Sequence, residues 1–312
     1  MRRLYLLSIL CLTLGQCWAQ VPNMVVNIKK TVAFIQLQCE DGAKLLDVRG
    51  TGFFVAYPDD RIGKDQAFVY LVTNRHVAMC VVDGRPLVVR SLAIRLNRKD
   101  GASGTIPLAT QGNIQWALPS DESEDLAVIG LAPDQHTYDY LAIPVSIFGT
   151  RDVLATEGVA EGERILFARF FYQFPGVSKV QPIVREGILA MMPDEKLPTT
   201  TGKPGNVYLG DVHVFGGNSG APVFFNLGGI HGSKIMGGEM YRLLGVVSGM
   251  FYEDEEFNLE VTTTLKGTGR ANSGISMIVP VDALKNLLDA PALKAQREAM
   301  AAAVKGQTGT KQ

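Results

Sequence analysis

Three short segments of the chain contain residue types that could together perform nucleophilic catalysis. The first is the glycine-rich run 216–223, in which Ser219 stands just before an apolar stretch. Glycines allow a tight backbone turn that exposes a hydroxyl and aims neighbouring N–H groups at one point. Taken alone, the run fits a glycine-rich hairpin equally well, so a catalytic interpretation requires a base and an acid elsewhere.

His76 and Asp125 have the positions expected of that base and acid. His76 follows an apolar stretch, and an imidazole that titrates near neutral pH is the usual group that activates a hydroxyl. Asp125 directly precedes another apolar stretch. A buried carboxylate is costly unless it accepts hydrogen bonds, and an imidazole N–H would supply one while fixing the ring tautomer. The acids just before it are instead expected to be solvated in a polar loop: Asp121, Glu122 and Glu124.

The order of histidine, aspartate and serine, together with four local motifs, resembles the chymotrypsin-like serine proteases. The motifs are Gly-Thr-Gly-Phe-Phe-Val at 50–55, Thr-Asn-Arg-His-Val at 73–77, Asp-Leu-Ala-Val at 125–128 and Gly-Asn-Ser-Gly at 217–220. The resemblance extends over about residues 26–288. It implies an all-β fold of two six-stranded antiparallel β-barrels packed around an active-site cleft, followed by a short C-terminal helix.

The same resemblance implies a role for each residue. Ser219 would attack the scissile carbonyl, His76 would take and return the proton, and Asp125 would orient the His76 ring. The main-chain N–H groups of Gly217 and Ser219 would form the oxyanion hole. The implied activity is that of a serine endopeptidase that forms an acyl-enzyme intermediate and uses no metal or other cofactor.

Two features make the resemblance closer to the bacterial HtrA-like and glutamyl-endopeptidase-like branch, here without a PDZ domain, than to digestive trypsin. No Ile-Val-Gly-Gly-type start precedes the first expected strand. Asn218 also replaces the acid that trypsin-type zymogens carry before the nucleophile. Because a neutral amide cannot form an ion pair with a freed ammonium group, we expect activity without cleavage of an activation peptide.

The sequence defines the substrate pocket less sharply. His213 stands six residues before Ser219, at the family's main specificity position, and an imidazole there would favour an acidic or polar side chain unless it is structural. The acidic run 253–256 could instead attract basic peptides or be a solvated loop. Proteins or peptides are the expected substrates. The residues that resemble the strand pairing with an extended substrate are Val247, Ser248 and Gly249.

Two other functions are compatible with the sequence: a catalytically silent protease-like binding module, and an esterase that uses the same triad. Folding does not require all three triad residues, which disfavours the silent module. With 30 basic and 31 acidic residues, the chain lacks the basic excess typical of nucleic-acid binding. The scattered histidines and cysteines show no metal-site spacing. Self-association is left open by the sequence.

The elements that must position these residues are expected to be short strands, because apolar stretches recur between turn formers and the chain has 33 glycines. We divide the chain into a β lobe at 20–148, which holds the expected base and acid, and a second at 149–290, which holds the serine. Helix is expected only near the end, where Asp282 could cap a short helix. The segment 291–312 is expected to be a helical or disordered tail packed on the second barrel.

Residues 1–19 have the pattern of a signal peptide: two arginines, an apolar run too short for a bilayer, and a small residue, Ala19, at the expected cleavage site. Secretion or export to a periplasm is therefore expected, with no membrane span left after cleavage. Cleavage would leave Cys39 and Cys80 as the only cysteines, in a compartment that permits disulfides. A bridge between them and two buried free thiols are both compatible with the sequence.

Overall fold

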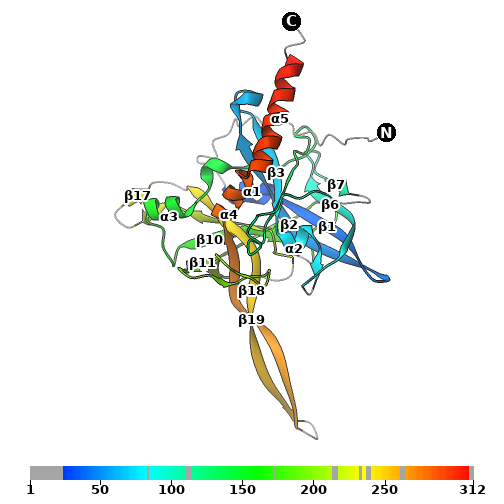
Figure 1. The fold of residues 1–312 in the computed structure, drawn as a ribbon. Helices are drawn as coiled ribbons and strands as arrows, with labels where there is room; N and C mark the ends of the chain where they lie inside the picture. The colour runs from blue at the N-terminus through cyan, green and yellow to red at the C-terminus, as the bar shows by residue number, and fades with distance from the viewer. Residues whose placement is uncertain are drawn as a thin grey trace.

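The computed structural model describes residues 24–82, 84–109, 114–171, 173–212, 217–231, 234–236, 240–260 and 264–308. Two groups of strands form most of this structure (Figure 1). The expected signal peptide at 1–19 and His213 lie outside the described residues. No helix in the described part of the chain is both long enough and apolar enough to cross a bilayer.

The first group is a seven-stranded sheet. Its path runs β7-β6-β1-β2-β3-β8, and β9 pairs with β2 in parallel. The strands are β1 Val32–Asp41, β2 Lys44–Pro58, β3 Ala67–Thr73, β6 Val88–Asn97, β7 Ser103–Ala109, β8 Ala127–Gly130 and β9 Ile143–Pro144. Within the described ranges the end strands β7 and β8 do not pair with each other, so closure of the expected first barrel is not confirmed.

The second group is a closed barrel of six strands, which confirms one of the two expected barrels. The order around it is β10-β11-β14-β19-β18-β15, with antiparallel pairing throughout. The strands are β10 Arg164–Phe170, β11 Pro182–Met191, β14 Tyr208–Asp211, β15 Pro222–Asn226, β18 Tyr241–Glu260 and β19 Thr264–Pro280. Three short ladders complete the strands: β4 Val81–Val82 with β5 Arg85–Pro86, β12 Leu197–Pro198 with β13 Pro204–Gly205, and β16 Gly229–His231 with β17 Lys234–Met236.

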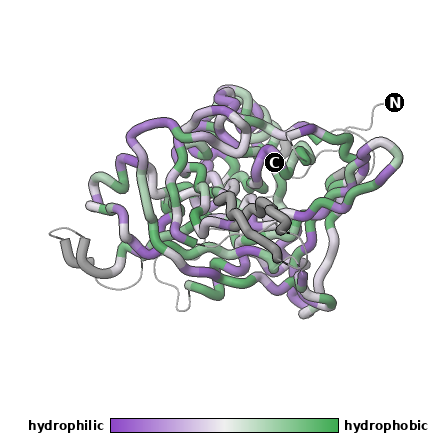
Figure 2. Tube along the Cα trace, turned by 90° about the horizontal axis from the view of Figure 1, so that it is seen from below, coloured by the Kyte–Doolittle hydropathy of each residue, from purple (hydrophilic) through white to green (hydrophobic). Residues whose placement is uncertain are grey.

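Strands β18 and β19 continue beyond the barrel as a long hairpin that projects from the body of the molecule (Figure 1). Their pairing runs from Gly245 opposite Pro280 to Glu260 opposite Thr264. The acidic run 253–256 therefore lies in a strand of this hairpin. Seen from the side of the hairpin, hydrophobic and hydrophilic residues are mixed along the chain (Figure 2).

Helices occur along the whole chain, so the expectation of helix only near the end is wrong. They are α1 Met24–Thr31, α2 Arg75–Ala78, α3 Arg151–Glu157, α4 Val281–Leu288 and α5 Pro291–Thr308, with 3₁₀ turns η2 Asp60–Ile62 and η3 Val145–Ile147. The expected C-terminal helix is confirmed as α4, but Pro280, not Asp282, is its N-cap. The Asp282 carboxylate instead accepts the main-chain N–H of Arg151, at the start of α3, at 3.1 Å.

Helix α5 was expected to pack on the second barrel, but it packs against the first sheet. Its Arg297 is 3% exposed and donates hydrogen bonds from Nη1 to Tyr70 Oη at 3.1 Å and to the Leu288 carbonyl at 2.8 Å. The guanidinium also lies 3.9 Å from the ring centroid of Tyr57. These contacts satisfy the buried cation and hold the helix on β2 and β3.

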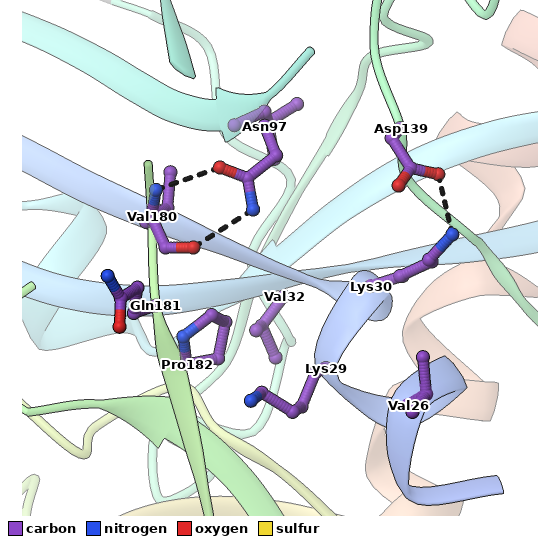
Figure 3. A pocket seen from close by; sticks show the side chains of 10 residues that line it. Val26, Lys29, Lys30, Val32, Asn97, Asp139, Val180, Gln181 and Pro182 are labelled. Carbon is purple, nitrogen blue, oxygen red and sulfur yellow. Dashed lines mark hydrogen bonds and ion pairs between the residues drawn. The ribbon is translucent and has the colours of Figure 1, made fainter. Parts of the chain in front are cut away.

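The two lobes are joined by polar contacts beside α1 (Figure 3). The side-chain amide of Asn97 accepts the N–H of Val180 at 2.8 Å and donates to the Val180 carbonyl at 2.9 Å. Lys30, in α1, forms an ion pair with Asp139 at 2.8 Å. A cavity of about 250 Å³ lies among these residues. Of these contacts, the two hydrogen bonds between Asn97 and Val180 join the first sheet to the segment that leads into β11 of the barrel.

The two cysteines form a disulfide. Cys39 in β1 and Cys80, just after α2, are both fully buried, and their Cα atoms are 6.6 Å apart. The bridge ties the segment that carries His76 to the central strand of the first sheet.

Candidate active site

The first part of the candidate site lies at the end of β3. Every residue of this strand is buried, and α2 begins directly after it with Asn74 as N-cap and His76 in its first turn. The Asn74 side chain donates a hydrogen bond to the Asp125 carbonyl at 2.7 Å. The strand end and its cap thus place His76 beside the segment that leads into β8.

Asp125 is 1% exposed and accepts three hydrogen bonds. Its Oδ1 accepts the His76 main-chain N–H at 3.0 Å, and its Oδ2 lies 2.7 Å from Nδ1 of the His76 ring. The Thr200 hydroxyl donates to the same Oδ2 at 2.8 Å. Because Nδ1 faces a carboxylate, it is the protonated ring nitrogen, and Nε2 is left as the basic one.

These contacts also determine the charge of the carboxylate. Burial alone would raise the pKa of Asp125, but the charge and hydrogen bonds of His76, with the Thr200 hydroxyl, outweigh it and hold this pKa below its usual value. Asp125 is therefore ionised at neutral pH. Of the neighbouring acids, Asp121 and Glu122 are exposed as expected, whereas Glu124 is half-buried, and burial followed by the charge of Asp121 raises the pKa of Glu124.

The serine segment forms a turn that is bonded to both lobes. The Ser219 carbonyl accepts the Thr51 N–H at 3.0 Å, and the Gly217 carbonyl accepts the Thr51 hydroxyl at 3.0 Å. On the other side, the Gly220 N–H donates to the Val247 carbonyl at 2.9 Å. Both glycines have positive φ, 89° at Gly217 and 86° at Gly220. Residues 217–220 thus form a fixed turn between β2 and β18.

The turn also lies against the strand that leads to His76. A Cβ atom on Gly220 would be 1.9 Å from the Thr51 carbonyl oxygen and 2.6 Å from Oγ1 of Thr73, which stands three residues before His76. Among the described residues, no hydrogen bond joins the Ser219 hydroxyl to the His76 ring. The structure therefore brings the serine turn next to the histidine segment without forming the nucleophile-to-base hydrogen bond.

The two N–H groups expected in the oxyanion hole remain available for a ligand. In the described part of the chain, the main-chain N–H groups of Gly217 and Ser219 donate to no protein acceptor. Asn218, between them, is 1% exposed, and its side-chain oxygen accepts a hydrogen bond from Nη1 of Arg169 in β10. Burial of Asn218 on Arg169 turns its side chain into the protein.

The segment expected to pair with substrate divides into two parts. Both main-chain groups of Val247 are used by the serine turn, since its N–H donates to the Ala221 carbonyl and its carbonyl accepts Gly220, both at 2.9 Å. Val247 therefore supports the turn and does not offer its main chain to a substrate, contrary to our expectation. Ser248 is buried at a register shift in β18, and Gly249 is partly exposed. His213 cannot be compared because it is outside the described residues.

Three residues that contact the site did not stand out in the sequence. Thr51 lies inside a quoted motif, and its role needed the fold to bring β2 to the serine turn. Thr200 lies in a run of three threonines, and Arg169 in an apolar strand. For Arg169, the one available signal in the sequence was a charged residue between Ala168 and Phe170 in an apolar stretch. No group of metal-ligating side chains occurs among residues that the structure describes.

Comparisons with known proteins find similarity in solved structures only. No protein-family model and no curated protein sequence matches the chain. A crystal structure of Deg5 matches 85% of this chain and 90% of its own, with 14% sequence identity and a TM-score of 0.46. The HtrA-type protease AlgW, solved with a decapeptide, matches 86% of this chain and 67% of its own, with 16% identity and a TM-score of 0.45.

Proposed function

We propose that the protein is an exported serine endopeptidase in which His76, Asp125 and Ser219 form the catalytic triad. The observation that carries this proposal is the double contact of Asp125 with the ring and the main chain of His76, at a carboxylate that is almost completely buried. Such a carboxylate holds the imidazole in one tautomer and stabilises the imidazolium that forms when Nε2 accepts a proton.

Ser219 is the proposed nucleophile because its turn is fixed between the lobes and borders the strand that ends at His76. The reaction requires the hydroxyl to approach Nε2 of His76. Contacts of this kind are often long in the free enzyme and tighten only when substrate binds. The turn and the cap at Asn74 would fix the two main-chain segments, so the approach would be made by the two side chains.

The proposed reaction is acyl transfer in two steps. Ser219 Oγ attacks the scissile carbonyl carbon while its proton moves to Nε2 of His76, and the resulting oxyanion is held by the N–H groups of Gly217 and Ser219. Collapse of this intermediate breaks the peptide bond, and His76 gives its proton to the leaving amine. Water, deprotonated by His76, then hydrolyses the ester and restores the serine.

Export is the remaining part of the proposal. Cleavage after Ala19 would release the mature protein to a periplasm or the outside of the cell, where it would act on proteins or peptides. The Cys39–Cys80 disulfide supports this, because such bridges persist in oxidising compartments. In the mature protein, lobes at 20–148 and 149–290 would form the cleft, followed by the tail at 291–312.

The test is labelling with a fluorophosphonate, followed by a casein digest. We expect the purified protein to be labelled and to digest casein, and Ser219→Ala to do neither while unfolding at the wild-type temperature. Ser91→Ala, which removes a hydroxyl from β6 outside the site, should behave as wild type. Absence of wild-type labelling would contradict the proposal in favour of a silent binding module, and labelling without digestion would indicate an esterase.

A further inference from the structure

The acid of the proposed triad is held by a residue from the other lobe. Thr200 lies between β12 and β13, in a small hairpin that leads into β14 of the closed barrel. Its hydroxyl donates a hydrogen bond to Oδ2 of Asp125 at 2.8 Å, the oxygen that also faces Nδ1 of His76 at 2.7 Å. The Thr200 hydroxyl and His76 Nδ1 share one buried carboxylate oxygen, so a change at Thr200 should alter the contact between Asp125 and His76.

The hairpin is packed against the loop that carries Asp125. Gly205, in β13, lies so close to Ser123 that a Cβ atom would be 2.6 Å from the Ser123 Oγ. Lys203 forms an ion pair with Glu122 on the same loop. Both contacts are to residues just before Asp125, so they hold the hairpin against the loop that carries the carboxylate.

Thr200 also touches β18 next to the serine turn. A Cβ atom on Gly249 would be 2.4 Å from Cγ2 of Thr200, so the methyl group of Thr200 occupies the space that a side chain at position 249 would need. Ser248, the residue before it, makes a long hydrogen bond of 3.5 Å to the Met277 carbonyl, and no hydrogen bond joins it to Asp125 in the described part of the chain. Thr200 thus supplies the third hydrogen bond to the carboxylate while resting on the strand expected to bind substrate.

We propose that Thr200 is a positioning residue that couples Gly249 in β18 to Asp125. Its methyl group packs against Gly249 and moves with the strand, and its hydroxyl orients the carboxylate that holds His76. The inference rests on the proposed function for its effect on catalysis, but the contact itself does not. A substrate main chain that pairs with β18 would contact Gly249. Movement of Gly249 would displace the Thr200 side chain and, through its hydroxyl, the carboxylate that holds His76.

The first experiment removes the hydroxyl while keeping the shape. In Thr200→Val, we expect kcat for a peptide ester to fall by about tenfold, because a hydrogen bond to a charged group is lost, with little change in KM. Without this donor the carboxylate attracts the protonated ring more strongly, so the acidic limb of the pH profile should move to higher pH. Thr200→Ser, which keeps the hydroxyl and loses only the methyl group, should restore the pH profile and most of kcat. Thr201→Val, in the same hairpin but bonded to Thr199, is the control and should resemble wild type.

The second experiment tests the methyl contact. Gly249→Ala should lower kcat because its new Cβ atom pushes Thr200 away from Asp125, and the double variant Gly249→Ala with Thr200→Ser should recover most of it, because serine lacks the methyl group. Recovery is a response that two independent structural defects would not give. A double variant as impaired as the product of the two single changes would overturn the coupling.

A measurement on inactive protein separates this inference from the proposed function. In Ser219→Ala, the Nδ1 proton of His76 should give a low-field proton NMR signal, and adding Thr200→Val should shift it, whereas adding Thr201→Val should not. If wild type is never labelled by a fluorophosphonate but the signal shifts, the function fails and the positioning contact stands. If labelling succeeds and Thr200→Val changes neither the signal nor the pH profile, the inference is wrong.

Discussion

The guanidinium of Arg169 donates a hydrogen bond to the side-chain oxygen of Asn218, the residue next to the proposed nucleophile. Arg169 is 2% exposed, and burial, followed by the charge of Arg185, lowers its pKa to about 10, so it is cationic at neutral pH. A cation from β10 thus holds the residue before the serine.

We therefore expect Arg169→Met to slow fluorophosphonate labelling by about tenfold to a hundredfold, because the turn that carries the oxyanion donors loses its support. Asn218 would be left buried with an unsatisfied oxygen, which costs about 1 to 3 kcal/mol of unfolding free energy. The rate of fluorophosphonate labelling measures the first effect, and urea unfolding measures the second. Arg164→Met, on the exposed part of the same strand, removes only a surface ion pair with Glu186 and should change neither. Equal labelling of Arg169→Met and wild type would contradict the assigned support.

Asp125→Asn should lower kcat by about 10⁴-fold, because an amide no longer fixes the tautomer of His76 or stabilises its protonated ring. Its effect on stability should depend on pH in a defined direction. The pKa of Asp125 is lowered in the folded protein, so its ionised form stabilises the fold above the unfolded pKa of about 4, and this contribution is lost as the pH falls through the lowered value.

Chemical unfolding of wild type and Asp125→Asn at pH 7 and at pH 3 measures this dependence. The difference in unfolding free energy should be larger at pH 7. A difference that stays constant or grows toward acid would show that the carboxylate is not the ionised partner of His76.

The positions of His76 and Asp125 could be inferred from sequence because His76 follows an apolar stretch and Asp125 directly precedes one. Both were therefore expected beside the end of a strand. The contact of Thr200 could not be inferred. It depends on a hairpin of the second lobe folding over a loop of the first, and a polar run of threonines has no periodicity that indicates burial.

Arg297 shows a similar limit for α5. A charged residue in an amphipathic pattern predicts a solvent-facing position, yet here the ring of Tyr57 and two oxygen acceptors compensate its burial. Helix α1 was missed for a different reason, since it is only eight residues long, although the spacing of Met24 and Ile28 is that of one helix face. Closure of the first sheet depends on pairing between distant strands, which local patterns do not encode.

Replacing Cys39 and Cys80 by alanine should lower the unfolding free energy by about 4 kcal/mol, the estimate for releasing a loop of 41 residues. The loop includes the whole of β2 and β3 and the turn that carries His76, so labelling should also become more sensitive to temperature. Guanidinium unfolding of oxidised wild type, reduced wild type and the double variant gives the comparison. Reduced wild type should match the variant, and equal stability of all three would contradict a bridge in the native protein.

Gly220 combines two constraints that a pair of variants can separate. Its φ of 86° is unfavourable for any residue with a Cβ atom, and that atom would lie 1.9 Å from the Thr51 carbonyl oxygen. Gly162 has a similar φ of 93° but open space around it, so Gly162→Ala reports the backbone cost alone, about 1 to 2 kcal/mol. We expect Gly220→Ala to cost clearly more and to abolish labelling, because the serine turn must move away from β2. If the two variants lose the same stability and both remain labelled, the serine turn does not depend on close contact with Thr51.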